Sequence, residues 1–328
     1  MTGLACGIDV GGTKIAAGVV DVAGSVLEEL AVESPAQDAL AIVTAVACLI
    51  SDLASRHEIV CAGIGAAGYV DRHQARIRSA PNLAWRDLNL KAELEKRLDL
   101  PVVVENDANA AAWGEFTFGA GRDVDDFLLV TVGTGVGGGM VLDGELHRGA
   151  HGVAGEIGHL RVVPGGIRCG CGNRGCLESY GSGTALVRAA RAAAQEGSGP
   201  ADALLHLAGG VVSAIDGPLI TEAALAGDPF ALAAFVDLGT WLGEGIASLA
   251  AVLDPAMVAI GGGVSEAGEL LLAPLRAAFR HHATSRGHEC VAVIRRAELA
   301  NRAGLIGAAE LARGWPARRL VPPDLTER

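Results

Sequence analysis

The chain has 328 residues and a formal net charge of −12 at pH 7, and 50% of its residues are hydrophobic. This length suits two domains that each bury a core of their own. The acidic balance argues against a nucleic-acid binder, and the longest apolar stretch, residues 241–252, is too short to span a bilayer.

The first predicted element is a β-hairpin over residues 5–21. Its two apolar runs flank a Gly-Gly-Thr turn at residues 11–13, where glycine adopts positive φ without steric cost. Such a bare turn lets backbone N–H groups approach an anion, and Asp9 and Lys14 border it. By itself this stretch fits a plain hairpin as well as a phosphate-binding loop.

The next elements follow from hydrophobic periodicity. We expect a strand over 26–32, a helix over 38–58, a strand over 59–65, a helix over 88–98 and a strand over 101–104. Residues 63–68 match the pattern G-x-G-x-x-G, but no helical pattern follows them. They therefore lack the context of a dinucleotide-binding fingerprint.

Three polar residues, Glu105, Asn106 and Asp107, end the strand over 101–104 and precede a helix predicted over 108–116. Ligands of open α/β sheets bind outside the carboxyl ends of the strands. A helix N-cap would explain one polar residue at this position but not three. The triplet is therefore a candidate for a functional site.

A second copy of the hairpin follows at residues 127–143. Laid over the first copy, it puts Thr131 122 residues after Asp9, Gly133 on Gly11 and Asp143 on Asp21. A repeat at a fixed offset predicts two related half-domains. Two such glycine turns could hold the phosphates of a nucleotide.

The most specific signal is a metal-binding pattern. Cys169, Cys171 and Cys176 follow His159 within a glycine-rich segment, and three thiolates with one imidazole form a standard closed zinc site. A full shell of four protein ligands leaves no position for a reactive water, so the zinc should be structural. The other cysteines, Cys6, Cys48, Cys61 and Cys290, lie in apolar runs and are predicted to be buried.

Two glutamates lie close to the predicted metal ligands in sequence. Glu156 precedes His159 by three residues, and Glu178 follows Cys176 by two. Carboxylates held in place by a metal loop suit recognition of hydroxyl groups, since each can accept several hydrogen bonds. The alternative is that they lie in solvent or form hydrogen bonds to the metal ligands.

The remaining elements follow in order. We expect helices over 184–196, 230–253, 267–281 and 303–313, and strands over 257–260 and 291–294. A Gly-Gly-Gly turn over 261–263 joins a strand to a helix, and residues 202–226 show no clear pattern.

Five of these stretches together resemble the ROK family of sugar kinases and repressors. They are residues 9–14 (DVGGTK), 105–109 (ENDAN), 131–139 (TVGTGVGGG), 155–159 (GEIGH) and 169–178 (CGCGNRGCLE). The run from 105 to 122 is most similar to bacterial glucokinases of the actinobacterial type. The resemblance implies an α/β protein with the two-domain actin-like ATPase fold, which is ribonuclease H-like and has a cleft between the domains. We expect a small domain over 1–113 plus about 300–328, and a larger, zinc-binding domain over 114–299.

The resemblance also implies the function, the transfer of the ATP γ-phosphoryl group to the 6-hydroxyl of glucose. Asp107 would be the general base. The sugar would be contacted by Gly68, Asn106, Asp107, Glu156, His159 and Glu178. The nucleotide and Mg²⁺ would be held by Asp9, Gly11, Gly12, Thr13, Lys14, Thr134, Gly135, Gly262 and Gly263. A structural Zn²⁺ would be bound by His159, Cys169, Cys171 and Cys176.

The sequence is also compatible with other substrates, another phosphoryl donor and a non-catalytic function. The same motifs serve ROK kinases of N-acetylmannosamine, N-acetylglucosamine or fructose, and polyphosphate could replace ATP as the donor. A non-catalytic, sugar-sensing repressor would carry an N-terminal helix-turn-helix, for which residues 1–4 leave no room. We expect a cytoplasmic homodimer or homotetramer that binds glucose and ATP, and neither nucleic acid nor a membrane.

Overall fold

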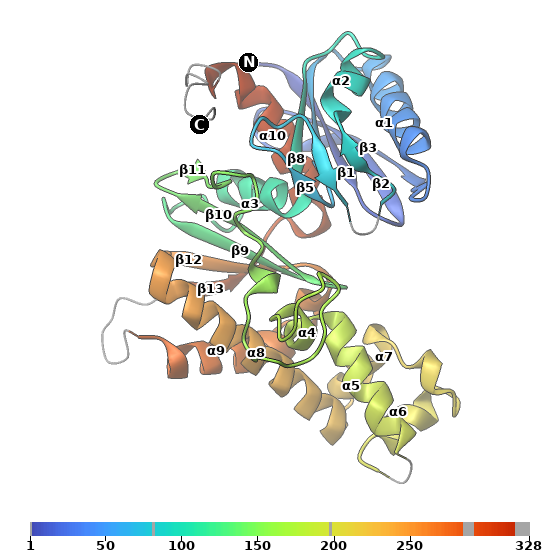
Figure 1. Cartoon of the computed structure of the whole chain (residues 1–328), viewed down its shortest axis with the longest axis vertical. Helices are drawn as coiled ribbons and strands as arrows, with labels where there is room; N and C mark the ends of the chain where they lie inside the picture. The colour runs from blue at the N-terminus through green and yellow to red at the C-terminus, as the bar shows by residue number, and fades with distance from the viewer. Residues whose placement is uncertain (1, 81–82, 197–198, 285–291, 319–328) are drawn as a thin grey trace. The chain divides into compact units, whose positions relative to one another are not determined.

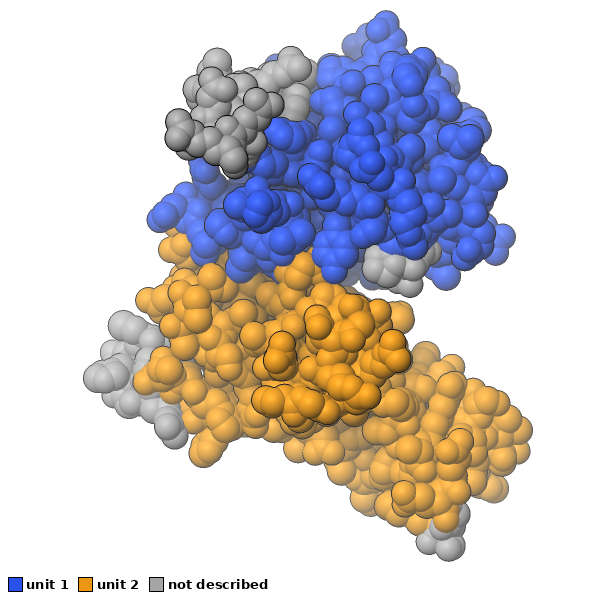
Figure 2. Space-filling view, viewed as in Figure 1, with its two compact units in different colours: residues 1–123, 139–155, 298–328 blue, residues 124–138, 156–297 orange. Residues whose placement is uncertain are grey.

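The computed structural model describes residues 2–80, 83–196, 199–284 and 292–318 (Figure 1). The chain forms two compact units, each built from separate stretches of sequence (Figure 2). Unit 1 comprises Met1–Asp123, Gly139–Gly155 and Glu298–Arg328, and unit 2 comprises Val124–Gly138 and Glu156–Ala297.

Two five-stranded sheets share one topology. The first has the order β3-β2-β1-β4-β8 and the second β11-β10-β9-β12-β13. The first is built from β1 (Leu4–Val10), β2 (Lys14–Val20), β3 (Val26–Glu33), β4 (Ile59–Ala66) and β8 (Val102–Asn106). The second is built from β9 (Phe127–Val132), β10 (Val136–Leu142), β11 (Glu145–Leu146), β12 (Met257–Gly261) and β13 (Val293–Arg296). The shared order confirms the two related halves predicted from the hairpin repeat.

The helices lie close to their predicted positions. They are α1 (Ala39–Ala54), α2 (Leu90–Glu95), α3 (Asp107–Phe118), α4 (Glu178–Gly181), α5 (Gly183–Gln195), α6 (Asp202–Leu207), α7 (Gly217–Leu225), α8 (Pro229–Leu253), α9 (Glu269–His282) and α10 (Ala303–Arg318). Sequence periodicity missed α4, α6 and α7, which are short, and the small sheet of β5 (Tyr69–Val70), β6 (Ile77–Ser79) and β7 (Arg86–Leu88).

The first sheet is covered on both faces, because side chains of successive strand residues point to opposite sides. Cys6, Ile8 and Val10 of β1 pack in the core beneath α1 and α2. Ala5, which precedes Cys6 and faces the opposite side of the sheet, packs with Leu305 on α10 instead. The two cores make the sheet of unit 1 a buried middle layer (Figure 1).

Glycines let α10 lie against the sheet at backbone distance. A Cβ atom built on Gly7 would overlap the carbonyl oxygen of Leu305, and one built on Gly63 would overlap that of Ala308. Helix α3 meets α10 in the same way, since a Cβ on Gly307 would overlap the carbonyl oxygen of Ala110. Gly63 therefore serves packing, in agreement with its exclusion as part of a dinucleotide motif.

The isolated cysteines do not all behave as predicted. Cys6 and Cys61 are buried, as expected, but Cys48 is exposed. The prediction was wrong for Cys48 because it lies on the solvent side of α1, between the buried positions Ala47 and Leu49. Cys290 lies outside the described residues.

Helix α8 is longer than the apolar stretch noted in the sequence. Among the described residues it is the one helix long and apolar enough to cross a membrane by length and composition, and 50% of its most apolar window is buried in the structure. It packs along α9, where a Cβ on Gly243 would overlap the carbonyl oxygen of Leu275. Core helices of soluble proteins have these properties as well.

The packing of α10 predicts a large effect for a small substitution. Gly63→Ala should lower the free energy of unfolding by about 1–3 kcal/mol or more, because the added methyl group must push α10 off the sheet. Urea unfolding measures this change. Gly217→Ala is the matched control, because a Cβ there meets nothing within 4 Å. Equal stability of the two variants would contradict the proposed contact.

Candidate active site and metal centre

Three parallel strands of unit 1 end at the same edge of the first sheet. In the register of β1, β4 and β8, Asp9 lies opposite Gly65, and Gly65 lies opposite Glu105. Asp107 follows β8 as the first residue of α3. The predicted acids Asp9 and Asp107 are thus brought together at the edge where open α/β sheets bind their ligands.

The Asp107 carboxylate is held by its neighbours. Its Oδ1 accepts hydrogen bonds from the backbone N–H of Ala108 at 2.9 Å and from Nδ2 of Asn106 at 3.1 Å. Asn106 is the N-cap of α3, accepting from the backbone N–H of Asn109, and also donates to the carbonyl oxygen of Gly68 at 3.1 Å. Asn106, Asp107 and Gly68 therefore form one connected group, as a precise site requires.

Burial raises the pKa of both acids. The pKa of Asp9 is raised to about 7, chiefly by burial and then by the charge of Asp107, against a smaller lowering by Lys14. Burial also raises the pKa of Asp107, against the hydrogen bonds that stabilise its ionised form. Two carboxylates that disfavour each other's charge suit a hard divalent cation such as Mg²⁺, which prefers oxygen ligands.

A third carboxylate, that of Glu105, belongs to the polar triplet predicted as a candidate site, but its contacts were not predicted. Glu105 is 3% exposed, and its Oε2 accepts hydrogen bonds from Arg148 Nε at 2.5 Å and Gln74 Nε2 at 3.1 Å. Its Oε1 accepts from the backbone N–H of Asn106 at 3.0 Å and from Asn109 Nδ2 at 3.2 Å. Glu105 thereby ties the start of α3 to two distant loops. A charged residue inside an otherwise apolar strand was the signal available in the sequence.

The first glycine turn lies at the end of β1. Its Thr13 and Lys14 are exposed, Gly11 and Gly12 are half-buried, and the turn is closed by the hydrogen bond from the Gly11 N–H to the Lys14 carbonyl oxygen at 3.0 Å. The Lys14 ammonium adds a positive charge beside a short stretch of accessible backbone. This combination can bind an anion.

The second glycine turn, in unit 2, borders a cavity of about 730 Å³. Gly133, Thr134 and Gly263 line it, together with Gly183, Thr184, Val187, Arg188, Arg191, Ala192, Gln195, Gly217, Pro218 and Val264. Gly262 has φ +80°, and a Cβ on it would press against the backbone of Val132. The turns predicted around 134 and 262 therefore meet, and the cavity beside them has the size of a small-molecule site.

The four predicted zinc ligands converge in unit 2. The ligand atoms of His159, Cys169, Cys171 and Cys176 all lie within 4.8 Å of one another. His159 Nδ1 is 3.7 Å from Cys169 Sγ, and the sulfur atoms of Cys171 and Cys176 are also 3.7 Å apart. A tetrahedral zinc with Zn–S bonds of about 2.3 Å places its sulfur ligands about 3.8 Å apart. The residues therefore fit a closed structural zinc site.

Both predicted glutamates lie beside this cluster. Glu156 Oε2 is 3.8 Å from His159 Nε2, the ring nitrogen that faces away from the thiols, and a carboxylate in that place orients a metal-bound histidine. Glu178 Oε1 accepts from Cys169 Sγ at 3.5 Å, and its Oε2 accepts from the backbone N–H of Val136 at 3.1 Å. Glu178 therefore contacts the second glycine turn as well as the cluster, a contact that sequence reasoning missed.

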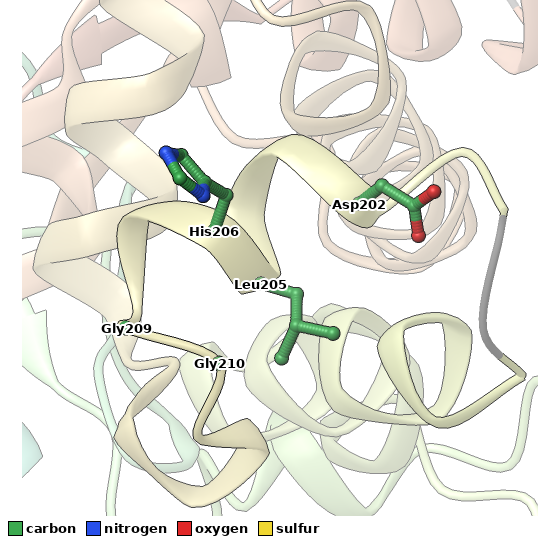
Figure 3. A pocket seen from close by; sticks show the side chains of 5 residues that line it. All are labelled: Asp202, Leu205, His206, Gly209 and Gly210. Atoms are coloured by element: carbon green, nitrogen blue, oxygen red, sulfur yellow. The ribbon is translucent and has the colours of Figure 1, made fainter.

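A second cavity, of about 520 Å³, lies beside α6 (Figure 3). Asp202, Leu205, His206, Gly209 and Gly210 line it. In Figure 3 the Leu205 side chain points away from that of His206. The predicted site residues do not line this cavity.

Comparisons with known proteins agree on one family. The model of the ROK family matches residues 5–314. The glucokinase of Streptomyces coelicolor is 47% identical over 311 residues, covering 95% of this chain and 98% of the relative. A ROK family glucokinase from Streptomyces griseus, solved with glucose and AMPPNP, is 50% identical, with a TM-score of 0.85 over 95% of this chain and 99% of its own. A ROK hexokinase from Thermus thermophilus is 35% identical, with a TM-score of 0.80 over 96% and 99%.

These neighbours have the two-domain actin-like ATPase fold, which confirms the predicted fold class.

The cysteine cluster gives a direct test of the metal site. Cys171→Ser should reduce the zinc content from about one ion per chain to nearly none, and should lower the unfolding midpoint by about 5 °C or more. Elemental mass spectrometry and a thermal melt measure the two effects. Cys48→Ser is the matched control, because Cys48 is exposed and isolated from the cluster. Full zinc retention in Cys171→Ser would exclude the predicted ligand set.

Proposed function

The chain belongs to the ROK family, and we propose that it is an ATP-dependent glucokinase, transferring the γ-phosphoryl group of ATP to the 6-hydroxyl of glucose. The observation that carries the proposal is the half-buried Asp107 carboxylate, which two hydrogen bonds hold at the strand edge beside Asp9 and the first glycine turn. Glucose is chosen as the substrate because relatives that are 47–50% identical over 95% of the chain are glucokinases.

In this proposal Asp107 acts as the general base. Its raised pKa makes it a better proton acceptor than an ordinary aspartate, and the hydrogen bonds from Asn106 and Ala108 fix the carboxylate while it orients the attacking hydroxyl. Phosphoryl transfer depends on alignment and on neutralising negative charge more than on covalent chemistry. One well-placed base is therefore a sufficient side-chain reactant.

The phosphates are proposed to lie on the two glycine turns. Gly11, Gly12, Thr13 and Lys14 serve from the first turn, and Thr134 and Gly135 from the second. Asp9 would hold Mg²⁺, and the ion would supply positive charge to offset that of the phosphates. Gly262 and Gly263 border the adenosine, for which the cavity of about 730 Å³ offers the space.

The sugar is proposed to contact Gly68, Asn106, Asp107, Glu156, His159 and Glu178. Zinc has a structural role in this proposal, since its four protein ligands complete the shell. The contact of Glu156 with the outer nitrogen of His159 supports a second role for this acid, in orienting the metal ligand.

The wider proposal is a cytoplasmic homodimer or homotetramer that binds neither nucleic acid nor a membrane. The domain boundaries expected near residues 113 and 300 also stay a prediction.

A substrate panel tests the function. We expect rapid ADP release from Mg-ATP with glucose, and at least about tenfold lower kcat/KM with fructose, N-acetylglucosamine and N-acetylmannosamine. A pocket built for a given set of hydroxyls discriminates against sugars that leave its polar groups unpaired. Parallel assays with polyphosphate identify the donor. Turnover confined to an N-acetyl sugar would show that this sugar, and not glucose, is the substrate. No turnover with any sugar would contradict the proposal that the protein is a sugar kinase.

The base is tested separately. Asp107→Asn preserves the shape of the side chain but cannot take a proton at neutral pH, so kcat with glucose should fall by about a thousandfold, within the usual range for a general base. Steady-state kinetics measure the loss, while zinc content and glucose binding should stay near those of the wild type. Asp237→Asn, on the exposed side of α8, is the control. A kcat within tenfold of the wild type would exclude Asp107 as the base.

A further inference from the structure

We infer that the segment Cys176–Thr184 is a mechanical link from the metal cluster to the second glycine turn, so that zinc occupancy controls the order of the turn and the affinity for nucleotide. The second half of this inference rests on the proposed function, in which Thr134 and Gly135 hold phosphates. The first half concerns only contacts within unit 2.

A single carboxylate contacts both ends of the link. Glu178 lies against Cys169 of the cluster at 3.5 Å and accepts a hydrogen bond from the backbone N–H of Val136 at 3.1 Å. The approach is so close that a Cβ atom on Gly135 would overlap the carboxylate. Glu178 follows the metal ligand Cys176 by two residues and contacts the turn directly. A shift of Glu178 would therefore move the backbone of the turn.

Two further hydrogen bonds join the same segment to the turn. The Gly183 N–H donates to the Gly133 carbonyl oxygen at 2.8 Å, and Thr184 Oγ1 donates to the Thr134 carbonyl oxygen at 2.6 Å. Three hydrogen bonds thus reach three of the four residues 133–136, and two of these four residues are glycines. Since glycine has the largest backbone freedom in the unfolded and locally open states, such a turn depends on outside partners for its order.

The segment is also anchored to the zinc loop, residues 159–175, which carries the other three predicted metal ligands. Leu177 is fully buried, and its N–H donates to the Leu160 carbonyl oxygen at 2.8 Å. The Tyr180 hydroxyl accepts from the backbone N–H of Ile167 at 2.8 Å, and its ring packs on Trp241 with centroids 4.7 Å apart. Helix α4 is therefore held between the zinc loop and α8, and loss of the metal would release the Cys176 end of the segment, next to Glu178.

Hydrogen–deuterium exchange of the full-length protein, with zinc bound and after removal of zinc by a chelator, tests the link without nucleotide. Exchange should become faster in the zinc loop and also at residues 133–136, by about tenfold or more at the Val136 amide. The first glycine turn, residues 11–14, is the internal control and should not change. Faster exchange in the zinc loop alone would overturn the inference.

Thr184→Val removes one hydrogen bond of the link while the ligands of the metal stay in place. The Kd for ADP, measured by calorimetry without sugar, should rise by about three- to tenfold, the usual effect of losing one hydrogen bond. Thr240→Val is the matched control, since its hydroxyl only donates to the Val236 carbonyl oxygen within α8.

Exchange measured on Thr184→Val separates the possible causes. Faster exchange at 133–136 together with weaker ADP binding supports the link, whereas weaker binding without faster exchange assigns Thr184 to direct contact and overturns it. If the zinc-bound wild type fails to bind ADP, the proposed nucleotide site fails, and the exchange data still decide whether the metal orders the turn.

Discussion

The position of Asp107 depends on contacts between backbones rather than between large side chains. Asp107 begins α3, α3 packs on α10 through Gly307, and α10 lies on β1 and β4 through Gly7 and Gly63. Because these surfaces meet without intervening side chains, little room exists for α3 to shift relative to the strand ends. Packing this close converts displacement into steric overlap within a few tenths of an ångström, so it fixes the carboxylate more firmly than aliphatic side chains would.

In unit 2 the predicted site residues are held in place by a metal site rather than by close backbone packing. The segment from 156 to 176 has little regular secondary structure apart from the turn of helix at Ile157–His159, and its backbone folds around four metal ligands. A closed zinc site supplies folding free energy to a loop that is too polar and glycine-rich to form a core. Its Glu156 and Glu178 then gain fixed positions that an ordinary surface loop would not provide.

The features predicted from sequence are those encoded locally. Each of these features depends on residues within about twenty positions of one another, a range in which turn residues and metal ligands have recognisable spacings. They are the two hairpins, the zinc ligands and the N-cap at Asn106. The missed contacts join residues far apart, such as Arg148 with Glu105 over 43 positions and Val136 with Glu178 over 42. Only the tertiary fold brings these pairs together, and the hydrophobic periodicity of the sequence does not indicate them. Gly63 shows the same limit, because its role depends on a helix that begins 240 residues later, at Ala303.

The charge of the chain limits how it can bind a phosphate donor. With a net charge of −12, the surface as a whole repels a polyanion. The described turns offer instead short stretches of backbone N–H, one exposed lysine at position 14, and the paired acids Asp9 and Asp107, whose mutual repulsion a divalent cation relieves. Such a site favours a compact donor that arrives complexed with its own cation over a long polyanion that needs a basic track. This electrostatic preference is the physical reason for proposing Mg-ATP as the donor.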